Sequence, residues 1–149
     1  MENNIEICWL PFGEPSQDAC DVRTEVFCRE QGYPEDEEFD DIDACSYHIT
    51  AYDDGKPIAA GRMYFDENRI MHLGRIAVVK RLRGTGVGKR IVEEMILKAE
   101  AMKPAGFELS AQSRAMGFYE KLGFTALGEE YMDGHVPHIR MQRRFLLCR

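Results

Sequence analysis

The spacing of apolar residues changes after the first ten positions of the chain. Residues 5–10 (IEICWL) alternate in the manner of a strand. Ser16 then stands where the N-cap of a helix is expected, and the helix runs to about Gln31. Its apolar face is formed by Ala19, Val22, Val26 and Phe27.

Three more strands are predicted in the middle of the chain. Residues 46–52 and 57–65 are separated by Asp53-Asp54-Gly55, where the glycine supplies the positive φ that a hairpin turn needs. Residues 70–79 (IMHLGRIAVV) follow, and their continuously apolar end predicts a strand buried on both faces.

The C-terminal half alternates helices with strands. Helical spacing precedes Pro104, residues 107–111 predict a strand, and residues 113–123 predict a short helix that ends at Gly123. The apolar face of the helix before Pro104 is formed by Val87, Ile91, Met95, Ile96 and Ala99. The C-terminal tail contains further residues typical of strands. The order of elements predicts a mixed α/β (α+β) fold in one domain, residues 1–149.

Composition agrees with one globular domain, since the chain has 149 residues of which 44% are hydrophobic. There is no run of about 18 apolar residues and no basic segment followed by an apolar stretch at the N-terminus, so we expect no membrane span, no signal peptide and a cytoplasmic location. The five cysteines are scattered without a metal-ligand pattern, which predicts reduced thiols and no metal.

The net charge of −7 is local in origin. Residues 34–43 (PEDEEFDDID) hold seven acidic residues, and the rest of the chain is balanced at 19 acidic and 19 basic. Such a surface disfavours nucleic acid and favours a cationic small partner. Two alternatives stay open for the segment: a solvated surface, or a set of carboxylates that attracts an amine acceptor.

A glycine-rich stretch, RLRGTGVGKRIVEEM from Arg81, follows the last central strand and opens a helix. A P-loop needs GxxxxGK followed by Ser or Thr, but Arg83 stands at the first position and Arg90 after Lys89. A dinucleotide fingerprint fails in both registers, because Lys89 or Ile91 stands where its last glycine is required. The stretch RGTGVG instead fits the pattern (Gln/Arg)xxGx(Gly/Ala).

In this pattern the sequence resembles the GNAT superfamily of acyl-CoA-dependent N-acyltransferases. Glycines let a backbone approach a pyrophosphate closely, and the free N–H groups of the first helical turn hydrogen-bond its oxygens. The alternative is a glycine-rich turn that binds nothing. The resemblance implies that the CoA loop consists of Arg83, Gly84, Thr85, Gly86, Val87, Gly88 and Lys89, with charge from Arg83 and Lys89.

A second motif supports the resemblance. Residues 115–124 (AMGFYEKLGF) match the AxxFYxxxGF pattern that GNAT enzymes carry on the next helix. The segments VFCREQGYPEDEEFDDID and GHVPHIRM also resemble a small bacterial GNAT subgroup whose acceptors are generally undefined. The family implies a mixed, mainly antiparallel sheet flanked by helices.

The resemblance also implies roles at the site. The N–H of Ile76 falls where the thioester carbonyl is held, and Val78 where the pantetheine arm is hydrogen-bonded. Tyr119 matches the tyrosine that protonates the CoA sulfur, a task that suits a phenol with an unperturbed pKa of about 10. Gln112 stands near the usual asparagine, and its amide is expected to bond to the pantetheine.

The general base is less well defined by sequence. A candidate equivalent of the glutamate found in many relatives is His72, while Gly74 occupies another place where an acidic residue often sits. Imidazole titrates near neutrality and suits proton abstraction. A partly buried strand histidine with no chemical role is an equally good interpretation of His72. The rivals are Glu30, His138 and a chain of water molecules.

The resemblance therefore implies an N-acetyltransferase that moves the acetyl group of acetyl-CoA to a primary amine by direct attack. The acceptor is an unidentified small molecule or peptide. The alternatives are a longer acyl donor and a sensor that binds acyl-CoA without turnover. Homodimers are common in the superfamily, so a homodimer is one expectation.

Overall fold

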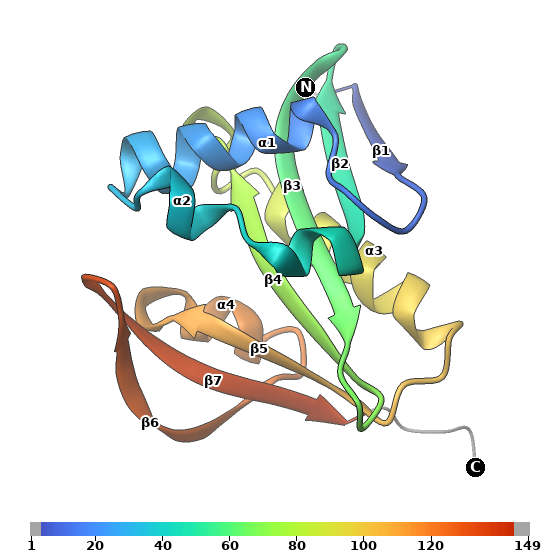
Figure 1. The fold of residues 1–149 in the computed structure, drawn as a ribbon, viewed down its shortest axis with the longest axis vertical. Helices are drawn as coiled ribbons and strands as arrows, with labels where there is room; N and C mark the ends of the chain where they lie inside the picture. The colour runs from blue at the N-terminus through green and yellow to red at the C-terminus, as the bar shows by residue number, and fades with distance from the viewer. Residues whose placement is uncertain (1–3, 145–149) are drawn as a thin grey trace.

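The computed structural model describes residues 4–144 and contains one seven-stranded sheet in the order β1-β2-β3-β4-β5-β7-β6 (Figure 1). Only β4 and β5 are parallel neighbours, so the predicted mixed, mainly antiparallel sheet is confirmed. The strands are β1 (Ile5–Trp9), β2 (Tyr47–Asp53), β3 (Lys56–Phe65), β4 (Ile70–Val78), β5 (Gly106–Gln112), β6 (Thr125–Asp133) and β7 (Val136–Arg144).

Helices cover both faces of the β2–β4 part of this sheet, α1 and α2 in front and α3 behind in the view of Figure 1. Gly61 in β3 permits the close approach of α3, because a Cβ there would lie 2.9 Å from Met95 Sδ. The helical segments are α1 (Gln17–Arg23), η1 (Thr24–Glu30), α2 (Glu35–Glu38), η2 (Asp41–Cys45), η3 (Lys80–Leu82), α3 (Val87–Glu100), η4 (Ser113–Ala115) and α4 (Met116–Glu120). None of the helices within residues 4–144 is long and apolar enough to cross a membrane.

The first helix begins as predicted, since the Ser16 hydroxyl accepts a hydrogen bond from the Ala19 N–H at 3.1 Å. It reaches Glu30, but its second half, η1, is π-helical. Ala19, Val22 and Val26 are buried in the core, as their spacing predicts.

Strands β4 and β5 separate after a short paired stretch, and this separation positions the site. They pair only over Ile70–Leu73 and Gly106–Leu109. Beyond that point β4 carries an extra residue relative to β3, a β-bulge at which Arg75 has a positive φ of 48°. We call the wedge between residues 74–78 of β4 and 110–112 of β5 the V.

The V corrects one expectation about β4. Its apolar end was expected to be buried on both faces, but Ile76 and Val78 are only half-buried. Ala77 and Val79 are buried, because they face the packed side of the strand. The predicted hairpin between β2 and β3 and the helix stop at Gly123, whose φ is +92°, are both confirmed.

Candidate active site

The glycine loop forms the end of the V from which α3 begins. Gly84 and Gly86 have φ values of +78° and +94°, a left-handed conformation that glycine adopts without strain. The first helical bond of α3 runs from Arg90 N–H to Gly86 O. The N–H groups of Val87, Gly88 and Lys89 therefore have no partner within the helix and are available to a ligand.

The side chains of the loop contribute unequally. Val87 is buried, Lys89 is exposed, and the Thr85 hydroxyl donates to Leu82 O at 2.5 Å. Gly88 lies close to α4, since a Cβ there would be 3.6 Å from the ring of Phe118. Lys89 offers a side-chain charge to a ligand of this loop, whereas the other cation of the loop, Arg83, is paired with Glu30.

Arg83 makes a different contact from the one expected. Its guanidinium binds both carboxylate oxygens of Glu30, at 2.5 and 2.6 Å, and its Nε donates to Val78 O at 3.0 Å. Its charge is therefore already paired within the protein. These hydrogen bonds hold the pKa of Glu30 below its ordinary value, which disfavours Glu30 as the base.

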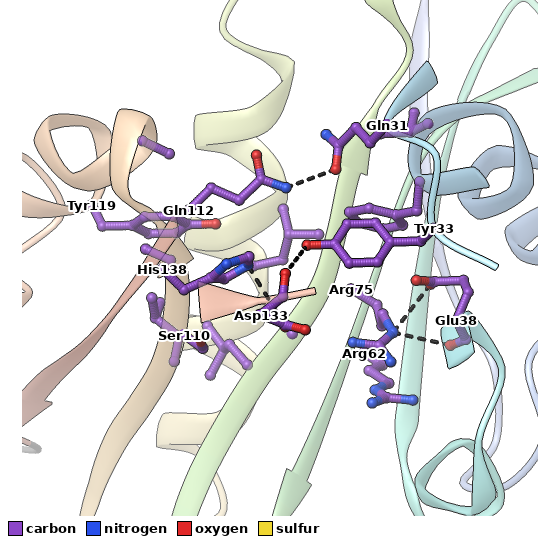
Figure 2. Close-up of a pocket in the computed structure, with 18 of the residues that line it drawn as sticks. Gln31, Tyr33, Glu38, Arg62, Arg75, Ser110, Gln112, Tyr119, Asp133 and His138 are labelled. Carbon is purple, nitrogen blue, oxygen red and sulfur yellow. Dashed lines mark hydrogen bonds and ion pairs between the residues drawn. The ribbon is translucent and has the colours of Figure 1, made fainter. Parts of the chain in front are cut away.

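A cavity of about 630 Å³ occupies the V and extends toward α2 and β7 (Figure 2). The Val79 N–H donates to Ile58 O on β3, and N–H groups alternate in direction along a strand. The N–H group of Val78 thus points away from β3 and into the V, the orientation that its expected role requires. Ile76 lies within the bulge and lines the cavity.

Tyr119 enters the cavity from α4. Its ring packs edge-on against Phe118 and Phe124, and Figure 2 shows its hydroxyl pointing into the cavity below Gln112. Only 9% of the residue is exposed, and this burial raises the pKa of the phenol. The hydroxyl therefore stays protonated at neutral pH and can act as a proton donor.

Gln112 lies at the rim of the V with both amide atoms in use. Its Nε2 donates to Gln31 Oε1 at 2.7 Å, and its Oε1 accepts from Arg114 Nε at 3.0 Å. One Nε2 N–H and one lone pair of Oε1 remain for a ligand.

The structure places His72 at the closed end of the V. It pairs in register with Glu108, stacks on Tyr64 and donates through Nε2 to Asp66 at 2.8 Å. Ile76 lies four positions further along β4, which corresponds to about 13 Å in a regular strand.

His138 lies higher in the V. It pairs with Gln112 on β5, three positions beyond the last β4–β5 pair, Leu73 and Leu109, and it lines the same cavity as Ile76. Its Nδ1 lies 2.9 Å from Val136 O, and a carbonyl only accepts hydrogen bonds. Nδ1 therefore carries the proton, which leaves the lone pair of the neutral ring on Nε2.

The lone pair of His138 faces a carboxylate. Nε2 is 3.8 Å from Asp133 Oδ2, and both residues line the cavity. Two acceptors that face the same space provide a site for an N–H donor. Sequence reasoning ranked His138 only as a rival base and did not identify Asp133; the PHIxM-like segment was the sole signal for this corner of the site.

The acidic segment divides into two sets: Glu35, Asp36, Glu37 and Asp41 are exposed, whereas the other three acidic residues are paired. Glu38 and Asp43 are buried, at 4% and 3% exposed, and Asp40 is partly buried. All three are bound by arginines from other elements. The ion pairs are Arg23–Glu38, Arg23–Asp43, Arg62–Asp40, Arg62–Asp43, Arg75–Glu38 and Arg75–Asp40, with N–O distances of 2.7–3.2 Å.

The cysteines do not form a reactive group. Cys8, Cys20, Cys28 and Cys45 are free thiols, and burial raises the pKa of both Cys20 and Cys28. Cys148 lies outside the described residues. Within residues 4–144 no group of three or more His, Cys, Asp or Glu side chains is arranged to hold a metal ion.

Comparisons with known proteins agree with this geometry. The family described as "Acetyltransferase (GNAT) domain" matches residues 15–145. The uncharacterized N-acetyltransferase YjcF of Bacillus subtilis is 40% identical over 131 residues, which cover 87% of this chain and 93% of YjcF.

Two solved structures are similar over nearly their whole length. The crystal structure of Escherichia coli ElaA has a TM-score of 0.85 at 27% identity, and that of an acyl-CoA N-acyltransferase from Pseudomonas aeruginosa has 0.81 at 28%. Each covers 94% of this chain and 99% of its own. The family match and the identity to YjcF show that this chain belongs to the GNAT acetyltransferase family, as its two motifs suggested.

Proposed function

We propose that the protein transfers the acetyl group of acetyl-CoA to a primary amine. The observation that carries the proposal is that Tyr119 and His138 line one cavity with Ile76, which lies in the wall that begins at the glycine loop. We take residues 1–149 as one catalytic domain that acts in the cytoplasm.

Acyl-CoA binds along β4 in this proposal. The free N–H groups at the start of α3 and the charge of Lys89 hold the pyrophosphate, while the N–H groups of Ile76 and Val78 hold the thioester carbonyl and the pantetheine arm. Gln112 binds the arm through its remaining amide N–H or oxygen lone pair. The similarity to the Pseudomonas acyl-CoA N-acyltransferase supports an acyl-CoA donor.

The amine binds between His138 Nε2 and the Asp133 carboxylate, where two acceptors face one space. As its nitrogen attacks the carbonyl carbon, a C–N bond forms and the C–S bond breaks. The amine proton passes to His138 Nε2, and Tyr119 gives its proton to the departing CoA sulfur. We assign the base to His138 rather than His72, because His138 Nε2 faces the Asp133 carboxylate in the open part of the V, whereas His72 lies at its closed end with Nε2 bound to Asp66.

Thiol release on mixing the protein with acetyl-CoA and a panel of primary amines tests the proposal. Release that requires both an amine and the Tyr119 hydroxyl supports it. Binding of acetyl-CoA without release for any amine would contradict it and favour a sensor that binds acyl-CoA without turnover.

A further inference from the structure

We infer that the acceptor is an amine that also carries a carboxylate, of the amino-acid class, and that Arg75 binds this carboxylate. The inference rests on the proposed function and specifies its acceptor. It departs from the cationic acceptor that the acidic segment suggested in the sequence.

Arg75 is placed in the cavity by the backbone of β4. The bulge that opens the V gives Arg75 its left-handed φ of 48° and puts it next to Ile76. Its side chain lines the cavity and is 26% exposed. In Figure 2 it lies with Glu38 on the α2 side, whereas His138 and Asp133 come from the β7 side.

The guanidinium of Arg75 is held in place but not fully used. Nε contacts Glu38 at 3.1 Å, and Nη2 donates to Asp40 Oδ2 at 3.2 Å and to Glu37 O at 3.3 Å. Within residues 4–144, Nη1 has no hydrogen-bond partner and keeps two N–H donors. A guanidinium fixed on one side in this way is preorganised for an oxygen ligand on the other.

The surroundings of Arg75 supply further donors, and among the described residues one unpaired carboxylate there, that of the exposed Glu37, also lines the cavity. The Nε of Arg62 is buried without a partner, and the Tyr64 hydroxyl has none among residues 4–144. Glu38, Asp40 and the buried Asp43 are matched by three arginines, so a cationic acceptor gains little from them. Burial raises the pKa of Tyr64, which keeps its hydroxyl a donor.

The cavity thus has acceptors on one side and donors on the other. His138 Nε2 and the Asp133 carboxylate suit an amine, while Arg75 Nη1 suits a carboxylate. One small molecule with both groups satisfies both sides. A simple polyamine leaves the Arg75 side without a partner and places a second cation near it.

The test compares amino acids with their own carboxamides as acceptors for the unmodified protein, by thiol release from acetyl-CoA. Each pair shares the side chain and the position of the amine. Because the carboxamide lowers the pKa of the amine, kcat/KM is compared per unprotonated amine. We expect kcat/KM to be about 10- to 100-fold higher for the acids, the range for a hydrogen-bonded charge. Carboxamides that react as well as the acids would overturn the inference and leave the proposed function standing. Failure of every amine in the panel would refute the proposed function, and this inference with it.

Variants locate the effect. Arg75→Met should reduce the acid-to-carboxamide ratio to near one, and Arg75→Lys should lower it less, because lysine keeps the charge but not the planar fork. Arg29→Met is the matched control: it removes the same charge from an exposed position on η1 outside the cavity and should keep the ratio. A folded Arg75→Met protein with an unchanged ratio would contradict the assignment. If Arg75→Met fails to fold, the comparison on the unmodified protein decides the inference.

Discussion

In β4 the groups assigned to the acyl-CoA donor are backbone N–H groups, and the one β4 side chain with an assigned ligand, Arg75, is assigned to the acceptor. In β5, β7 and α4 the groups that face the V are side chains. The β4 wall continues into the glycine loop, and the half-buried side chains of Ile76 and Val78 contribute mainly packing. The opposite wall presents Tyr119, Gln112 and His138, which come from three separate segments of the chain.

This difference separates two tasks. A backbone wall suits the constant part of a substrate, because it depends on conformation more than on side-chain identity. A side-chain wall suits proton transfer, because acids and bases are side chains. Apart from the acceptor contact assigned to Arg75, substitutions on the β4 wall should therefore affect acetyl-CoA binding or the fold, and substitutions on the opposite wall should affect turnover.

The largest expected effect is on the loop. Gly86→Val should abolish detectable binding of acetyl-CoA in calorimetry, because it forces a branched side chain into a left-handed conformation at the mouth of α3. Gly55→Val is the control, since Gly55 has a φ of +82° and equally open surroundings in the distant β2–β3 turn. Both variants should lose about 1–2 kcal/mol of stability. Equal affinity of the Gly86→Val and Gly55→Val variants for acetyl-CoA would refute the claim that the loop backbone binds acetyl-CoA.

The next effect is on the base. His138→Asn should lower kcat/KM by about 10³-fold and remove the acidic limb of its pH profile, while the asparagine amide replaces Nδ1 as donor to Val136 O. His72→Gln is the matched control, because the glutamine amide replaces Nε2 as donor to Asp66. Its kcat/KM should change by less than about fivefold. If the acidic limb of the pH profile is lost in His72→Gln and kept in His138→Asn, the base is His72 and not His138.

The third effect concerns the buried ion pairs that Asp43 forms with Arg23 and Arg62. Burial alone would raise the pKa of Asp43, but the hydrogen bonds and charges of Arg23 and Arg62 outweigh it and hold the pKa below its ordinary value. The ionised Asp43 carboxylate therefore contributes its full share of the free energy of unfolding at pH values above its ordinary pKa. This contribution is lost as the pH falls through the lowered pKa. Asp43→Asn should cost about 3 kcal/mol at pH 7 and less at pH 3.

Chemical denaturation at the two pH values measures this loss. The exposed Asp41, in the same segment, provides the control: Asp41→Asn should change stability by less than about 0.5 kcal/mol. An equal loss for Asp43→Asn at both pH values would argue against the ion-pair explanation.

The smallest of these effects is on the leaving group. Tyr119→Phe keeps the packing against Phe118 and Phe124 but removes the proton donor, so kcat should fall by about 10² with acetyl-CoA affinity unchanged. Steady-state kinetics with the best amine measures the change. Full activity in Tyr119→Phe would leave the tyrosine with a packing role only.

Local patterns in the sequence predicted most of the fold. The capped first helix, the β2–β3 hairpin and the strand–loop–helix around Gly86 depend on neighbours in the chain, and all three are present. Tyr119 stands out in sequence for the same reason, because it lies inside a contiguous motif.

The rest depends on contacts between distant segments. The bulge at Arg75 arises from a register shift between β3 and β4, and His138 reaches the cavity because β7 pairs with β5. The pairing of Glu38, Asp40 and Asp43 could not be predicted for a similar reason, since their partners Arg23 and Arg62 lie outside the segment. Charge counting along the chain does not reveal such pairs.

The division between the two walls is tested most directly by titrating acetyl-CoA into a Tyr119→Phe, His138→Asn double variant in a calorimeter. If β4 binds the donor and the opposite wall carries out the chemistry, the Kd should stay within about threefold of that of the unmodified protein. A folded double variant that binds acetyl-CoA more than about tenfold more weakly would contradict the division, because the side-chain wall would then contribute to holding the donor.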